Sequence, residues 1–337
     1  MKLESLALCL LLLTVTSCAG RKAAATPAEK PAAAREFDFT YSVRLSNLPK
    51  NSHSLRIWIP VATSGEHQSV RLLKTAGTVP LRITQESEYG DRMAYAEIHH
   101  PGFTTANFVL TYHVRRDMYS VGSFRELMQD NNNPVQIFPT LSRFVQPDRL
   151  IPIDGEIKQI ADRVTSGHQG EIEKAHDIYN YVFHNMRYDK SGTGWGHGNA
   201  LWACDARHGN CTDFHSLLIG MMRAEHIPAR FVIGFPLPPG KSQGVVPGYH
   251  CWAEFYVAGK GWVPVDISEA WLDQAKYNYF FGSVDANRVR FSAGRDITLA
   301  PKQSGPPVNY FVYPYVELNG KPYTRIQDHF SFRNTSS

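Results

Sequence analysis

The sequence has little net charge, few cysteines, no internal repeat and no long apolar segment. Its 337 residues carry a formal net charge of +4. No run of basic residues stands out either, so nothing supports a nucleic-acid partner. No stretch reaches the roughly 18 apolar residues that a membrane-spanning helix needs. Only five cysteines are present, and two of them, Cys9 and Cys18, fall in the first eighteen residues.

The N-terminal segment is typical of an export signal. A short apolar run from Leu6 to Leu13 follows Lys2, and its length suits a signal-peptide core better than a membrane span. Val15-Thr16-Ser17-Cys18 resembles a bacterial lipobox, in which small residues precede a cysteine that receives lipid. We therefore expect residues 1–17 to be a signal peptide and Cys18 to be lipidated. A plain secretory signal with an incidental cysteine is the alternative.

The residues after Cys18 indicate a tether. Residues 18–35 are rich in Ala, Lys and Pro and have almost nothing to bury, which predicts a flexible linker. We expect the folded part to lie in a bacterial cell envelope, lipid-anchored at the periplasmic face of the outer membrane.

Alternating apolar residues follow the tether. Phe37 to Leu45, Leu55 to Ile59 and Phe108 to Val114 show a period of two, which predicts half-buried antiparallel strands. Residues 36–120 are therefore expected to form a β-sandwich-like domain without catalytic groups. Residues 150–332 are expected to form a second domain that starts with helices and closes with strands.

Cys211 lies where a helix is predicted to begin. Asn210 and Thr212 can cap that helix, and Asp213 suits its positive end. Free N–H groups and the helix dipole favour a thiolate at this position. The same donors could hold an oxyanion formed when the thiolate attacks a carbonyl.

A predicted hairpin follows about forty residues later. Residues 248–257 and 262–266 read as strands joined by the turn at Gly259-Lys260-Gly261. His250 and Asp266 lie at similar distances from the turn, although the sequence does not fix the register. A cysteine, a histidine and an orienting carboxylate are the groups that thiol-based acyl transfer requires.

These motifs resemble those of the transglutaminase-like superfamily. The matching segments are Gly209-Asn210-Cys211-Thr212-Asp213-Phe214, Ile227-Pro228-Ala229-Arg230-Phe231-Val232, His250-Cys251-Trp252-Ala253-Glu254-Phe255 and Gly261-Trp262-Val263-Pro264-Val265-Asp266.

The resemblance implies an α+β, papain-like fold in which a nucleophile helix packs on an antiparallel sheet. It implies Cys211 as nucleophile, His250 as general base and acid, and Asp266 as the orienting group, with no cofactor or metal. The expected substrate is a protein, a peptide or a peptidoglycan peptide, with hydrolysis favoured over cross-linking. Cys251 replaces the commoner alanine; because alternate strand residues face opposite ways, we expect it to point away from His250 and not to touch the triad.

Two alternatives compete with this interpretation. Cys204, His208, Cys211 and His215 have a spacing that suits a structural zinc site. The chain could also be a catalytically idle scaffold or interaction protein of the envelope. Three cysteines remain beyond Cys18, and we expect Cys211 to be the free one, whether or not Cys204 and Cys251 pair.

Overall fold

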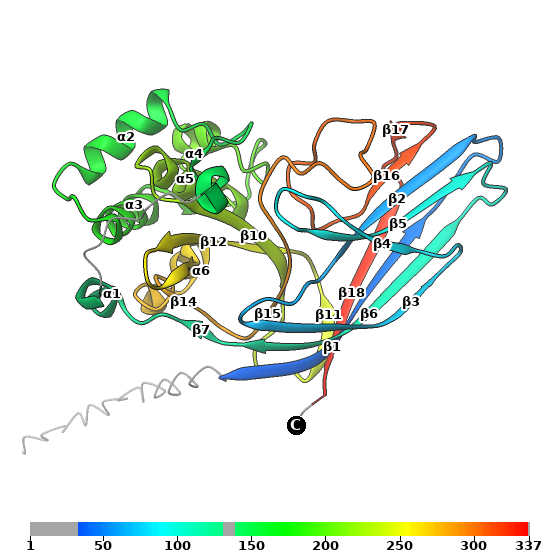
Figure 1. The fold of residues 1–337 in the computed structure, drawn as a ribbon, viewed down its shortest axis with the longest axis horizontal. Helices are drawn as coiled ribbons and strands as arrows, with labels where there is room; N and C mark the ends of the chain where they lie inside the picture. Colours follow the sequence, from blue (N-terminus) through cyan, green and yellow to red (C-terminus); the bar gives the residue numbers. More distant parts are fainter. Residues whose placement is uncertain (1–32, 131–138, 336–337) are drawn as a thin grey trace, which may run out of the picture. The chain divides into compact units, whose positions relative to one another are not determined.

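Three antiparallel sheets and a group of helices make up the computed structural model, which describes residues 33–130 and 139–335 (Figure 1). The predicted signal peptide, Cys18 and nearly all of the predicted tether lie outside the described residues. None of the described helices is long and apolar enough to cross a membrane.

Two five-stranded sheets form the predicted sandwich. Their inner faces carry the expected alternation: every second residue of the first strand, from Phe37 to Leu45, is buried. One sheet has the order β11 (Gln243–Val246), β18 (Ile326–Asn334), β1 (Ala34–Leu45), β6 (Ala106–Asp117) and β3 (Gln68–Gly77). The other has the order β17 (Lys321–Pro322), β16 (Tyr315–Leu318), β2 (Ser54–Val61), β5 (Arg92–His99) and β4 (Arg82–Gln85).

The sandwich takes strands from both ends of the described chain. β1 pairs with β18, and β2 pairs with β16. The predicted domain boundaries, 36–120 and 150–332, do not match this pairing, because β16 and β18 complete the two sheets of the sandwich. The physical reason is the apolar face of β18: Phe330 and Phe332 are 4 % exposed, and the ring of Phe330 is covered by Tyr41 of β1 and Phe235 of β10.

The third sheet supports the helices. Its order is β13 (Gly261–Val265), β12 (His250–Val257), β10 (Ala229–Pro236) and β15 (Arg288–Ala293). Helix α5 (Cys211–Ala224) packs on β12 and β10 (Figure 1). Around α5 lie α2 (Gly155–Thr165), α3 (Glu171–Asn185), α4 (Ala200–Ala206) and α6 (Ile267–Leu272).

Short elements connect these layers. The two-stranded pairs are β7 (Tyr119–Ser120) with β14 (Ser283–Val284), and β8 (Arg187–Tyr188) with β9 (His208–Gly209). A further helix, α1 (Phe124–Asp130), and two 3₁₀ turns, η1 (Pro139–Val145) and η2 (Gln274–Lys276), complete the described elements. The expected α+β class, with a β-sandwich and a helix packed on an antiparallel sheet, is confirmed.

The β18 pairing leads to a stability prediction. The ring of Phe330 lies 4.7 Å from that of Tyr41 and 4.2 Å from that of Phe235, so it joins the sandwich core to β10. Phe330→Ala should lower the free energy of unfolding by about 3–5 kcal/mol. His329→Ala, on the exposed face of the same strand, should change it by less than about 0.5 kcal/mol. Denaturant unfolding measures both; equal effects would contradict the assigned strand face.

Candidate active site

The nucleophile helix begins with a complete capping box. The Asn210 side chain accepts a hydrogen bond from the Thr212 N–H at 2.9 Å, and Asp213 accepts one from the Asn210 N–H at 3.0 Å. Gly209 allows this close approach, because a Cβ at its position would lie 2.4 Å from the Asp213 carboxylate. Cys211 is therefore the first residue of a well-capped helix, as the sequence predicts.

Asp213 also fixes the glycine-rich loop before α5. Its two oxygens accept hydrogen bonds from the N–H groups of Gly196 at 2.7 Å and Gly198 at 3.0 Å. On the other side, the Tyr249 hydroxyl lies 3.0 Å from the Asn210 amide nitrogen and 2.9 Å from the Thr212 hydroxyl. The start of α5 is thus held both by the loop before it and by the residue before His250.

The three predicted site residues come together in the structure. His250 Nε2 lies 2.7 Å from Asp266 Oδ2, which leaves Nδ1 as the nitrogen available to the Cys211 thiol. All three side chains are buried: Cys211 is 3 %, His250 7 % and Asp266 0 % exposed. A cavity of about 270 Å³ lies against His250.

More groups stabilise the ionised form of Asp266 than the sequence indicates. Arg288 Nη1 donates a hydrogen bond to Asp266 Oδ2 at 2.8 Å, and Ser268 Oγ and the Glu269 N–H donate to Oδ1. Burial would raise the pKa of Asp266, but the positive charges of His250 and Arg288 lower it well below its usual range.

The charge of Asp266 sets the protonation of His250. Burial would lower the pKa of the imidazole, but Asp266 and then Cys211 raise it well above its ordinary value. The pKa of Cys211 is lowered well below that of a free thiol, first by the hydrogen bond from Cys251 and then, against burial, by His250. At neutral pH the arrangement therefore favours a thiolate–imidazolium pair.

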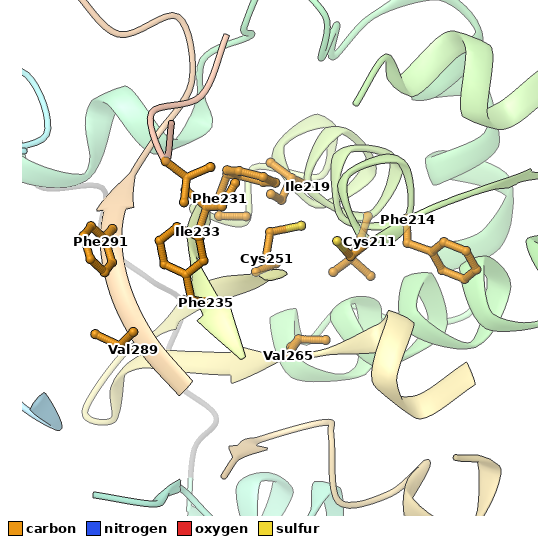
Figure 2. Packing of buried hydrophobic residues seen from close by; sticks show 14 of the residues in the cluster. Cys211, Phe214, Ile219, Phe231, Ile233, Phe235, Cys251, Val265, Val289 and Phe291 are labelled. Atoms are coloured by element: carbon orange, nitrogen blue, oxygen red, sulfur yellow. The ribbon is translucent and has the colours of Figure 1, made fainter. Parts of the chain in front are cut away.

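Cys251 contacts the nucleophile, which corrects a prediction. Its Sγ lies 3.7 Å from His215 Nδ1, and its pKa is raised well above its usual value by burial and by the neighbouring Cys211 thiol. Figure 2 shows the Cys251 sulfur turned toward the start of α5. The alternation rule fails here because His250 is only the first residue of β12 and lies opposite Gly234, where β10 has an irregular register with β15.

His215 is a second group that the sequence does not assign to this site. It is fully buried, and burial lowers its pKa. Its Nε2 accepts a hydrogen bond from the Ile267 N–H at 3.3 Å, so the proton lies on Nδ1, which donates to the Cys211 carbonyl at 2.7 Å. Neutral His215 therefore links the first turn of α5 to the residue that follows Asp266.

The zinc alternative finds no support in this geometry. Both nitrogens of His215 have hydrogen-bond partners, and Cys204 Sγ contacts Glu156 instead, at 3.8 Å. Among residues 33–130 and 139–335, no three His, Cys, Asp or Glu side chains are placed to hold a metal ion. Cys204 and Cys251 are both free thiols and form no disulfide with each other.

The comparisons with known proteins agree with this architecture. Residues 158–267 match the family model of the transglutaminase-like superfamily. An uncharacterised protein of Haemophilus influenzae is 28 % identical over 323 residues, covering 85 % of this chain and 86 % of that protein.

Two solved structures are also similar. A candidate cysteine protease from Cytophaga hutchinsonii has a TM-score of 0.60 and 19 % identity, covering 91 % of this chain and 93 % of that one. The periplasmic domain of TgpA from Pseudomonas aeruginosa has a TM-score of 0.35 and 17 % identity, covering 70 % of this chain and 77 % of that one; so low a score carries no argument.

The fold and the family match together define a class. The protein has a transglutaminase-like core that contains a buried cysteine, and a buried histidine that is hydrogen-bonded to a buried aspartate. The match over residues 158–267 is to the transglutaminase-like superfamily, and this similarity supports a thiol-dependent enzyme.

The Cys251 contact can be tested by alkylation. Cys251→Ala removes the thiol that helps to lower the pKa of Cys211, so that pKa should rise. The pH midpoint of iodoacetamide alkylation at Cys211, followed by peptide mass spectrometry, should move upward accordingly. Cys204→Ala is the matched control and should leave the midpoint in place. An unchanged midpoint in Cys251→Ala would exclude Cys251 from thiolate stabilisation.

Proposed function

We propose that this protein is an acyl-transfer enzyme that cleaves peptide or related amide bonds through a thioester on Cys211. One observation carries the proposal: a cysteine on the first turn of a capped helix contacts a histidine that is bonded to a buried carboxylate. Those groups supply a nucleophile, a proton carrier and an orienting charge in one place.

The residues account for each step of the reaction. The Cys211 thiolate attacks the substrate carbonyl, and the resulting oxyanion lies near the Cys211 N–H, one of the N–H groups that a helix start leaves without an intrahelical partner. The His250 imidazolium then gives its proton to the departing amine as the C–N bond breaks. A water molecule, deprotonated by His250, attacks the thioester, releases the acid and restores the thiol group of Cys211 as the thiolate.

The cavity beside His250 favours water over an amine as the acceptor. Its walls include the carboxylate of Glu269, whose Oε1 lies 4.0 Å from His250 Nε2, while the other lining carboxylate, Asp285, is ion-paired with Arg288. Negative charges stabilise the protonated form of an amine, which is not nucleophilic. Water has no such disadvantage, so we infer hydrolysis in preference to cross-linking. The name given to the Cytophaga structure is consistent with hydrolysis.

The experiment that tests this function follows the acyl-enzyme. An activity-based probe with an electrophilic carbonyl should label wild-type protein on Cys211 and leave Cys211→Ala unlabelled. Peptides and peptidoglycan-derived peptides are then offered with water alone or with added amine. Product formed at the same rate with and without amine supports hydrolysis; amine-linked product as the main species would assign cross-linking. Absence of any Cys211 adduct in folded protein would favour the scaffold interpretation.

Asp266 gives the sharpest test by mutation. Asp266→Asn removes the charge that keeps His250 protonated and correctly oriented, so kcat should fall by at least ~10²-fold. Asp273→Asn, at the other end of the same helix α6 and ion-paired only with exposed Lys276 among the described residues, is the matched control and should retain activity. A wild-type rate in Asp266→Asn would overturn the assignment.

We also propose that the protein is anchored to the cell envelope through lipid on Cys18. The support is the sequence Val15-Thr16-Ser17-Cys18 after an apolar run. In a bacterial host fed an alkyne fatty acid, the wild-type protein should take up the label and fractionate with membranes. Cys18→Ser should lose both properties, whereas Cys9→Ser should keep them. Equal labelling of Cys18→Ser would refute lipidation at this cysteine.

A further inference from the structure

A small polar cavity lies where the sandwich meets the sheet that carries His250. Its volume is about 60 Å³, and its walls come from the segment before β3, from β6 and from strands β10, β12, β13 and β15. The charged side chains that line it are those of Glu66, Arg116, Arg230, Glu254 and Arg290, together with His67. The cavity is separate from the candidate active site, since none of the residues of the triad lines it.

The positive groups of this cavity are incompletely neutralised. Arg230 is ion-paired with Glu254 at 2.5 Å. Among the described residues, Arg116 and Arg290 have no ion pair, and the Nε atom of each is buried without a hydrogen-bond partner. His67 Nε2 is a third buried atom without a hydrogen-bond partner, and Glu66 Oε2 lies 3.9 Å from it. Three unsatisfied nitrogens thus line one cavity.

Arg116 is the group in this cavity whose burial is most unfavourable for the folded state. The residue is 4 % exposed, and a buried charge without a counter-charge is strongly unfavourable. Burial, followed by repulsion from Arg288, lowers the pKa of Arg116 to about 10. That value still leaves the guanidinium charged at neutral pH. The positive charge therefore persists in the fold, and Glu254, the carboxylate that raises the pKa of Arg116 most, is already ion-paired with Arg230.

We propose that this cavity binds a small inorganic oxyanion of the size of phosphate or sulfate, held by Arg116 and Arg290. The volume corresponds to roughly four to six water-sized spaces, which suits a five-atom oxyanion. Guanidinium groups are well matched to such anions in geometry and charge. Glu66, whose side chain is 86 % exposed, lies at the rim and disfavours a larger polyanion.

The bound anion would join two layers of the protein. Arg116 belongs to β6 of the sandwich, whereas Arg290 belongs to β15 of the sheet on which α5 packs. An oxyanion between them replaces repulsion between two arginines by attraction to a shared partner. The sandwich would then be held more firmly against the sheet, so the anion stabilises the folded protein.

Thermal unfolding of the whole folded chain tests this site. Wild-type protein is compared in chloride, phosphate and sulfate at equal ionic strength, together with Arg116→Met. At about ten times the dissociation constant, phosphate should raise the wild-type Tm by about 2–4 °C. Arg116→Met should show no such rise, and in chloride it should melt at or above the wild-type temperature, because the unpaired buried charge is gone.

The neighbouring residue supplies a matched control. Arg115 lies on the opposite, exposed face of β6 and pairs with Glu36 and Asp117. Arg115→Met should respond to phosphate like the wild type. An equal rise in all three proteins would be a general salt effect and would overturn the proposal, as would no rise in the wild type.

Two further arms complete the test. If Arg116→Met does not fold, Arg290→Met should lose the response to phosphate in the same way, and a retained response would overturn the site. Phenyl phosphate distinguishes the source of the anion. Stabilisation by phosphate but not by phenyl phosphate supports a free ion; equal stabilisation would overturn the free-ion source and assign a phosphomonoester group instead.

Discussion

The Asp266 carboxylate carries a negative charge at a position where its side chain does not reach water. Such a charge is stable only with partners of opposite sign and full hydrogen bonding. Arg288 and His250 both contact Oδ2, and the start of α6 contacts Oδ1. The positions of the catalytic imidazole and of helix α6 are therefore both set by the need to satisfy this one group.

The charge on Asp266 acts on Cys211 through His250. A protonated imidazole is stabilised by the carboxylate, and it in turn stabilises the thiolate. Cys251 adds a thiol donor, while neutral His215 holds the Cys211 carbonyl and the Ile267 N–H. The nucleophile is thus surrounded by donors, although most of its environment is apolar (Figure 2).

Much of this arrangement can be predicted from local sequence. The capped start of α5 follows from Asn210 and Asp213, and the hairpin that carries His250 and Asp266 follows from alternation and the turn at Gly259. Period-two patterning also predicts β1, β2 and β6. These features depend on interactions between residues that are close in sequence, and such interactions can be recognised in a single sequence.

The remaining features depend on contacts between distant segments. Arg288 reaches Asp266 across 22 residues, and no motif marks it. The role of Cys251 depends on how α5 crosses the end of β12, which alternation alone predicts wrongly. The strands β18 and β16 pair with β1 and β2 because their apolar side chains are buried in the same core. The domain boundary therefore could not be predicted from the order of the segments along the chain.

The ionisation of Cys211 tests the central claim most directly. The ultraviolet absorbance of the thiolate, titrated with pH in the wild type and in Cys211→Ser, isolates this one group by difference. A thiolate already formed at neutral pH, whose signal is lost only as the pH falls well below the free-thiol pKa of about 8.5, is the predicted result. A difference signal that appears only at or above that value would contradict the thiolate–imidazolium pair and the chemistry built on it.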